Sequence, residues 1–167
     1  MIVLRVVRLA ALACGTFVAA AALTSVPAHA AACNTITSVK NSAPLTANKA
    51  AGGHVKQHVL GETQGADDPQ TGKTLFADGA KYAAAWRQYG YYGTVACSGR
   101  AVSQEMTLTQ LHMGFLDAYS CTASNPNGSC KTKTLYMAHS IFYGFILRGS
   151  TWILNTAYPV PLTAMRH

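Results

Sequence analysis

Hydrophobic residues are densest in the last third of the chain, where they form two consecutive runs. The runs at 134–147 and 152–158 are rich in β-branched, aliphatic and aromatic side chains. Between them, the sequence Arg-Gly-Ser-Thr at 148–151 has the composition of a tight turn. Two such runs joined by a short turn predict a β-hairpin. Pro159 and Pro161 follow, and we expect them to end the second strand.

Helical patterns are shorter and lie in the first half of the chain. Residues 54–60 place two histidines and two valines on one side of a short helix. From about 79 to 89, apolar residues recur every three and four positions. Asp78 is expected to cap that helix, and Gly90 to end it. Residues 103–119 fit a helix and a strand about equally well.

The first thirty residues predict an export signal rather than part of the fold. Two arginines precede the apolar run 9–23, and Ala-His-Ala at 28–30 has the small residues of a cleavage site. A membrane anchor is the alternative, but the run is short for a span. We therefore expect a secretory signal peptide at 1–30. A tail or linker rich in Ala, Asn, Thr and Ser is expected at 31–50, and one domain at 51–167.

The composition suggests a basic protein after export. Without Arg5 and Arg8, 11 Lys and Arg residues (13 − 2) face 6 Asp and Glu residues, a net charge of about +5 (11 − 6) with neutral histidines. A small basic exported domain is typical of ligands for nucleic acids or anionic surfaces, but also of proteins that are simply soluble. The basic residues are scattered, so any basic patch must arise by folding.

Four cysteines follow the predicted cleavage site, at Cys33, Cys97, Cys121 and Cys130. An even number in an exported chain predicts two disulfides, with three possible pairings. We favour Cys121–Cys130, because the residues at 122–129 favour turns throughout. Cys33 would then pair with Cys97. A zinc site is the alternative, but the sequence contains no Cys-x-x-Cys pair and no histidine close to a cysteine.

His54 and His58, four residues apart, are the first candidates for chemistry. Such a pair suits half of a zinc site, general acid–base catalysis, or a purely structural role. Zinc proteases have a glutamate beside the first histidine, where this chain has a valine, so we expect no metal. Lys56 and Lys73 are candidate cations for a phosphate group, although either could be an ordinary solvated lysine.

Hydroxyl and aromatic side chains supply further candidates. Thr156 and Tyr158 alternate along the second predicted strand and should share one of its faces. They could hold a phosphate group or orient a histidine, or they could simply favour the strand. Tyr91 and Tyr92 could stack on nucleobases, or they could pack within the protein.

Two of these segments together resemble a known family. Gly-Gly-His, followed by His-Val, at 52–59 is similar to the motif that opens the bacterial ribonuclease A-like toxin domain of contact-dependent growth inhibition proteins. Trp-x-Leu-x-Thr-Ala-Tyr-Pro at 152–159 is similar to the motif that ends it. The two motifs occur in the same order, about one hundred residues apart, and the resemblance covers roughly 51–161.

The resemblance implies a kidney-shaped α+β fold, in which N-terminal helices pack on an antiparallel sheet. It also implies cofactor-free cleavage of RNA, in which the ribose 2′-hydroxyl attacks the adjacent phosphate. By position, His58 matches the catalytic histidine, and Thr156 and Tyr158 match the hydroxyl residues. His54 could share the proton transfer, and Lys73 is the nearest match to the family's basic residue. The family typically lacks disulfides and forms part of a larger exported protein, and this chain departs from both features.

From these observations we expect a secreted or periplasmic ribonuclease, monomeric and without stable membrane insertion after signal cleavage. Its substrate would be RNA, bound with help from Lys56, Tyr91 and Tyr92. A toxin of this kind would also have a cognate immunity or inhibitor protein. A non-catalytic exported binding or inhibitor module is the alternative, and a zinc-dependent hydrolase is a third hypothesis.

Overall fold

The computed structural model describes residues 30–162. The predicted signal peptide lies outside this part of the chain except for its last residue. None of the helices within 30–162 has the length and apolar character needed to cross a membrane.

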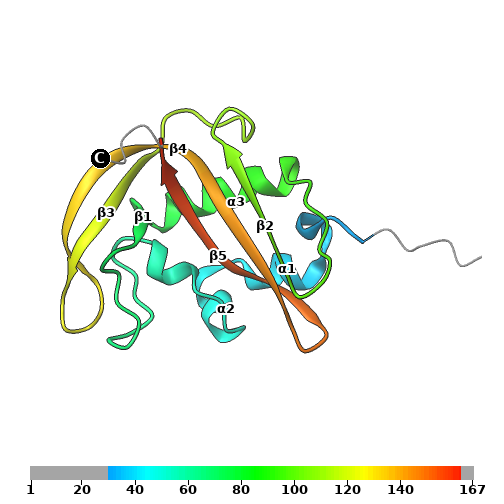
Figure 1. Ribbon diagram of the computed structural model, residues 1–167, viewed down its shortest axis with the longest axis horizontal. Coiled ribbons are helices and arrows are strands. Elements are labelled where there is room, and N and C mark those ends of the chain that lie inside the picture. The colour runs from blue at the N-terminus through cyan, green and yellow to red at the C-terminus, as the bar shows by residue number, and fades with distance from the viewer. Residues whose placement is uncertain (1–29, 163–167) are drawn as a thin grey trace, which may run out of the picture.

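The described chain has the α+β class, with most of its helices before its strands (Figure 1). Three α-helices and two 3-10 helices are present: η1 (Cys33–Thr35), α1 (Thr37–Ser42), α2 (Leu45–Ala50), η2 (Val55–His58) and α3 (Gly79–Tyr92). Five strands accompany them: β1 (Thr74–Phe76), β2 (Ala101–Thr107), β3 (Asp117–Ser124), β4 (Cys130–Arg148) and β5 (Thr151–Pro161).

All strand pairs are antiparallel, and the long strand β4 connects two lobes. Its first part pairs with β3, which also pairs with β1. Its second part lies between β2 and β5. In Figure 1, β3 and the start of β4 therefore form one arm, and β2, β5 and the rest of β4 form the other.

The predicted hairpin and both predicted disulfides are confirmed. β4 and β5 pair from Arg148 and Thr151 outward, and the bonds are Cys33–Cys97 and Cys121–Cys130. Pro159 does not end β5, which continues to Pro161. A proline is tolerated here because no other strand within residues 30–162 pairs with the edge of β5 that lies away from β4.

The prediction of a tail or linker at 31–50 is wrong. This segment forms α1 and α2, and Val39 and Ala43 are fully buried in the core. Each helix has only 6 residues. Isolated helices this short are unstable in water, and too few turns are present for a helical period to show in the sequence. Tertiary contacts, including the Cys33–Cys97 disulfide, stabilise them instead.

Helix α3 begins as predicted and ends later. The Asp78 carboxylate accepts a hydrogen bond from the Lys81 backbone N–H at 2.8 Å, which is the expected cap. The helix continues through Gly90 to Tyr92, and Gly93 follows it. A glycine within the last turn costs only about 1 kcal/mol relative to alanine, and burial of the inner face of α3 offsets this cost.

Helix α3 covers one face of the β2–β4–β5 lobe. Tyr143 and Phe145 of β4 are buried on this face, and the ring centroid of Tyr89 in α3 lies 4.2 Å from that of Tyr143, with the two rings tilted by 35°. Because side chains alternate along a strand, Phe142 and Gly144 point to the opposite face. We call this opposite face, which Thr156 and Tyr158 share by register, the outer face.

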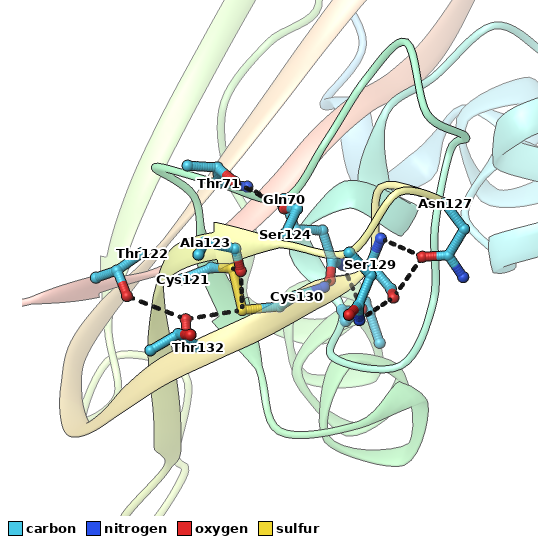
Figure 2. Close-up of a disulfide and its surroundings, with 12 residues drawn as sticks. Gln70, Thr71, Cys121, Thr122, Ala123, Ser124, Asn127, Ser129, Cys130 and Thr132 are labelled. Carbon is cyan, nitrogen blue, oxygen red and sulfur yellow. Dashed lines mark hydrogen bonds between the residues drawn. A yellow bond between two sulfur atoms is a disulfide. The ribbon is translucent and has the colours of Figure 1, made fainter.

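The loop before β1 is hydrogen-bonded to the hairpin that the Cys121–Cys130 disulfide closes (Figure 2). Gln70 is fully buried, and its carboxamide oxygen accepts a hydrogen bond from the Cys130 backbone N–H at 2.8 Å. Its carboxamide nitrogen donates to the Val59 carbonyl at 2.8 Å. Gln70 thus connects the Cys121–Cys130 hairpin to the turn that carries the two histidines.

Candidate active site

A cavity of about 480 Å³ lies between η2, the start of β1 and the outer face of β5. It brings together all five residues predicted to be catalytic, although the sequence separates the first from the last by about one hundred positions. The lining residues are His54, Gln57, His58, Gly72, Lys73, Thr74, Asn155, Thr156 and Tyr158.

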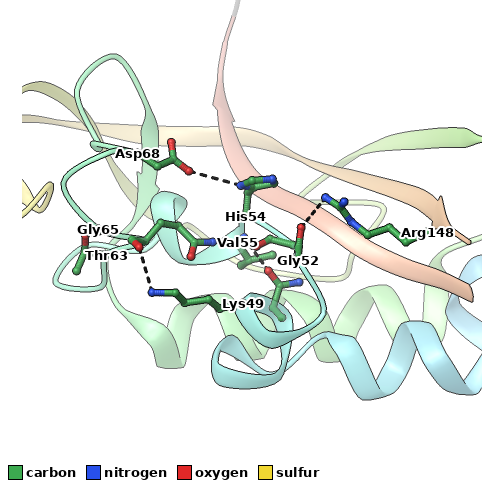
Figure 3. A network of polar contacts seen from close by, with 11 residues as sticks. Lys49, Gly52, His54, Val55, Thr63, Gly65, Asp68 and Arg148 are labelled. Carbon is green, nitrogen blue, oxygen red and sulfur yellow. Dashed lines mark hydrogen bonds and ion pairs between the residues drawn. The ribbon is translucent and has the colours of Figure 1, made fainter.

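Two glycines place the histidine turn against β5. Gly52 has a φ of 83°, in the left-handed region that favours glycine, and its carbonyl accepts a hydrogen bond from Arg148 at 2.8 Å (Figure 3). A Cβ on Gly53 would lie 2.5 Å from the Asn48 carboxamide, so only glycine fits there. His54 is then held by a backbone hydrogen bond from its N–H to the Asn155 carbonyl.

The Asn48 side chain stabilises this arrangement through hydrogen bonds to three backbone groups. It is fully buried, and its carboxamide nitrogen donates to the carbonyls of Ser42 and Leu154, at 3.0 and 2.7 Å. Its oxygen accepts from the Val55 backbone N–H at 2.9 Å. One side chain therefore joins α2, β5 and η2, which fixes the histidine turn relative to the strand that carries Thr156.

His58 is buried, with only 8% of its surface exposed. Its Nδ1 lies 2.9 Å from the Thr74 carbonyl, which can only accept, so Nδ1 carries the proton and Nε2 is the free basic nitrogen. Burial lowers the pKa of His58 to about 4, with smaller contributions from the positive charges of Lys73 and His54. The ring is therefore neutral at pH 7 and can accept a proton.

His54 has a different environment. Its ring is half-exposed, and its Nδ1 lies 3.5 Å from a carboxylate oxygen of Asp68 (Figure 3). When His54 is protonated, this contact becomes an ion pair. Histidines in two such different surroundings can divide the roles of base and acid between them. Within residues 30–162, no three His, Cys, Asp or Glu side chains gather closely enough to hold a metal ion.

Lys73 supplies a cation to the same cavity. It directly precedes β1, where its carbonyl accepts from the Cys121 backbone N–H at 2.9 Å and its own N–H donates to the Gln70 carbonyl at 3.0 Å. None of the ion pairs in the described part of the chain involves Lys73. Its ammonium group is thus available to an anionic ligand.

Three side-chain oxygens of residues that line this cavity are buried without a hydrogen-bond partner in the described chain. They belong to Gln57, Asn155 and Thr156. Buried polar groups in native proteins are nearly always paired, so unpaired ones around a cavity indicate a polar ligand or water. Beside them, burial and the nearby charge of Glu105 raise the pKa of Tyr158, which keeps its hydroxyl protonated as a donor.

Three residues predicted to bind substrate lie outside this cavity. The Lys56 ammonium group pairs with a Glu62 carboxylate oxygen at 2.7 Å. Tyr91 is 73% exposed at the end of α3, and the Tyr92 ring stacks 4.3 Å from the ring of His112. None of the three lines the cavity.

Sequence reasoning missed Gln57, Asp68 and Asn155. Strict alternation along β5 would turn Asn155 away from Thr156, but a register shift opposite Gly144 and Phe145 brings both to the cavity. Gln57 directly precedes His58, and that adjacency was the available signal. Asp68 lies in a polar loop with no sequence pattern that could have marked it.

No family model, curated protein or solved structure matches this chain. The geometry of the cavity and the two sequence motifs are therefore the grounds on which a function can be proposed.

Proposed function

We propose that this protein is a secreted, metal-independent ribonuclease of the ribonuclease A-like class that acts as an antibacterial toxin. The observation that carries the proposal is the grouping around one cavity of a neutral buried imidazole, a second imidazole beside a carboxylate, a free ammonium group and two hydroxyl groups. These are the groups that cleavage of RNA by its own 2′-hydroxyl requires.

In the proposed reaction, Nε2 of His58 takes the proton from the ribose 2′-hydroxyl as the 2′-oxygen attacks phosphorus. The phosphorane carries an additional negative charge, which Lys73 stabilises and to which Thr156 and Tyr158 donate hydrogen bonds. The bond from phosphorus to the 5′-oxygen then breaks, and His54 gives its proton to the leaving oxygen. The products are a 2′,3′-cyclic phosphate and a free 5′-hydroxyl.

Asp68 supports the acid in this scheme. Its carboxylate lies beside Nδ1 of His54, so it orients the ring and leaves Nε2 to face the leaving group. The opposite arrangement is disfavoured, because a pKa of about 4 leaves the His58 ring neutral at pH 7, with no proton on Nε2 to give to the leaving oxygen.

Features away from the cavity agree with this proposal. The antiparallel two-lobed α+β architecture is consistent with the kidney shape that the family resemblance implies. Two disulfides are typical of proteins from oxidising compartments, as a secreted or periplasmic toxin would be. A cognate immunity protein would be its partner in the producing cell.

The test uses the chain from residue 31 onward with both disulfides formed. Structured RNA is incubated with EDTA present, and fragments are resolved on gels. We expect cleavage, and we expect His58→Ala to reduce the rate by about 10²–10⁴-fold. His139→Ala is the matched control, since His139 is an exposed histidine on β4, outside the cavity.

An oligonucleotide with a single ribose in a DNA backbone tests the attacking group. We expect cleavage only after that ribose, with a 2′,3′-cyclic phosphate detected by mass spectrometry. The proposal fails if wild-type protein leaves RNA intact with EDTA, or if His58→Ala cleaves as fast as the wild type. Binding of RNA without cleavage would favour the non-catalytic module instead.

A further inference from the structure

The first part of strand β4 has an edge that no other strand of the described chain uses. The second part of β4 lies between β2 and β5, whereas the first part pairs only with β3. The chain leaves the opposite edge at Leu108, whose N–H donates to the His139 carbonyl at 3.1 Å, and a turn follows. In Figure 1, β4 is accordingly the outermost strand of the arm that it forms with β3. Within residues 30–162, this edge of β4 from 131 to 137 is therefore open.

Backbone donors and acceptors point outward along this edge. The Ala138 N–H donates to the Leu116 carbonyl, on the side of β3. Because successive residues of a strand direct their backbone groups to opposite edges, Lys133, Leu135 and Met137 direct theirs away from β3. None of the turn and loop hydrogen bonds between backbone groups of the described residues uses them. Such a row of unpaired groups is a template for one more strand.

The side chains along the open edge are apolar at one end and basic at the other. Leu135 and Met137 are 57% and 55% exposed, and they share one face of the strand with Lys133. Lys131 lies at the start of β4, where the register shifts. Aliphatic side chains of this size are seldom left in solvent on two successive positions of one strand face, so this part of the surface is suited to a partner.

A cavity of about 310 Å³ continues this surface at the point where β2 leaves β4. Met113 and Phe115 line it from the loop between β2 and β3, and Met137 and His139 line it from β4. Phe115 is 87% exposed. An open strand edge that leads into an apolar cavity matches an extended chain, because its backbone can bond to the edge while one of its side chains fills the cavity.

The charges on the open edge distinguish between a second copy and another protein. Lys131 and Lys133 form no ion pair within the described residues, and β4 contains no acidic residue. Pairing of two copies along this edge would gather four lysines at one interface, which is unfavourable. Asp117 lies opposite Met137 but on β3, one strand further from the edge. The charges therefore favour a different chain that carries carboxylates.

We propose that the open edge of β4 at 131–137 binds an extended acidic segment of another protein as an additional antiparallel strand. Carboxylates of that segment lie opposite the two lysines, and its apolar side chains pack on Leu135, Met137 and the cavity beside Phe115. A nucleic acid could use the lysines, but it would leave the carbonyls of the edge and the aliphatic side chains without matching groups.

This surface is separate from the candidate active site, and the inference does not depend on the proposed ribonuclease function. By register, Thr134 shares a face of the sheet with Thr74, which lines the candidate active site. Leu135 points to the opposite face, because side chains alternate along the strand. The partner therefore binds without covering the cavity that holds the histidines.

The probe is the acetylated and amidated peptide Leu-Thr-Ile-Thr-Val-Thr-Glu-Thr-Glu. Paired antiparallel, it places its glutamates opposite Lys131 and Lys133, and its leucine at the cavity. It is titrated into the isotopically labelled chain from residue 31 onward, with both disulfides formed, and amide shifts are followed by NMR. We expect a dissociation constant of about 1 mM or tighter, with shifts at 113–115 and 131–139. A matched peptide with lysine in place of glutamate should bind about tenfold or more weakly.

Two variants and a control locate the binding. Leu135→Pro removes an N–H that faces solvent and keeps the pairing with β3, so it should abolish binding and leave cleavage of RNA as in the wild type. Lys131→Glu with Lys133→Glu should reverse the preference, so that the lysine peptide binds more tightly. Lys81→Glu with Arg87→Glu makes the same change in charge at exposed positions of α3, and it should keep the wild-type preference.

Three results with the peptides overturn the proposal. They are the absence of shifts at 131–137 at millimolar concentrations of the glutamate peptide, unchanged binding to Leu135→Pro, and an unchanged preference in the variant with both lysines replaced. Two further results assign the edge to a different occupant and overturn it as well. Self-association of the wild type in sedimentation experiments, absent in Leu135→Pro, would indicate a second copy. A single-stranded DNA oligonucleotide that shifts the same amides more strongly than the peptide would indicate a nucleic acid.

Discussion

Acidification should destabilise this protein through His58, and the effect can be measured without any substrate. In the folded chain, burial holds the pKa of His58 at about 4, whereas the ordinary value is 6.5. Replacing His58 with glutamine removes this titration. Glutamine keeps an N–H group that can reach the Thr74 carbonyl, so the variant preserves the polar contact while losing the ionisable ring.

The magnitude follows from the two pKa values. Between pH 6.5 and about 4, the unfolded chain binds a proton at His58 and the folded chain does not. The contribution of His58 to the free energy of unfolding is therefore fully present above pH 6.5. It falls as the pH decreases through this window, and it is lost below pH 4. At 1.36 kcal/mol for each pH unit, the loss attributable to His58 is about 3 kcal/mol.

Urea titrations at pH 7 and pH 4 provide the assay. Carboxylates titrate in both proteins and largely cancel, so the quantity of interest is the difference between the acid-induced losses of wild type and His58→Gln. We expect the wild type to lose about 3 kcal/mol more. His139→Gln serves as the control, because His139 is exposed and its replacement should leave the acid-induced loss as in the wild type.

Equal losses in the wild type and His58→Gln, within about 1 kcal/mol, would refute the reasoning. His58 would then be solvated in solution, and the argument that it is a neutral base at pH 7 would lose its support. If the expected difference is found, the acid limb of kcat/KM that reports the free enzyme's base should lie well below pH 6.5.

Three further predictions concern the other groups around the cavity and the fold. Asp68→Asn should lower kcat/KM less than about tenfold, since a half-exposed ion pair contributes at most about 1 kcal/mol; a pH–rate profile identical to that of the wild type would contradict its role. Lys73→Ala should weaken RNA binding and reduce the slope of log affinity against log salt by about 0.7, whereas Lys73→Arg should restore that slope. Replacing both cysteines of Cys33–Cys97 with serine should lower the free energy of unfolding, measured in urea, by about 4 kcal/mol. The same replacement of Cys121–Cys130 should lower it by about 3 kcal/mol, because this disulfide closes a shorter loop and so restricts the unfolded chain less. The reverse order would contradict this loop-entropy argument.

Local chemistry made several elements predictable. The Asp78 cap, the hairpin of β4 and β5, and the turn-rich loop inside Cys121–Cys130 all depend on residues a few positions apart. For the same reason, the predictions failed or stayed open where distant contacts decide the conformation. Residues 31–50 were expected to be a linker, and residues 103–119 fitted helix and strand equally, because a short apolar segment acquires its structure from the surface it packs against.

In the candidate site, too, some properties could be predicted from the sequence and others depended on distant contacts. Its two motifs could be found in the sequence, because the types of side chain that carry protons, charge or hydroxyl groups are readable one residue at a time. By itself the sequence also allowed a zinc site. It favoured His58 over His54 only through the family resemblance, and it did not assign the roles of base and acid to the two histidines.

Only the tertiary structure distinguishes the environments of the two histidines. His58 is buried with its Nδ1 on the Thr74 carbonyl, and His54 is half-exposed beside Asp68. The sequence determined that histidines stand at these positions. Which one is a neutral base depends on solvation and on hydrogen-bond partners that arrive from other parts of the chain, and both arise only when β1, β5 and the loop before β1 close around them.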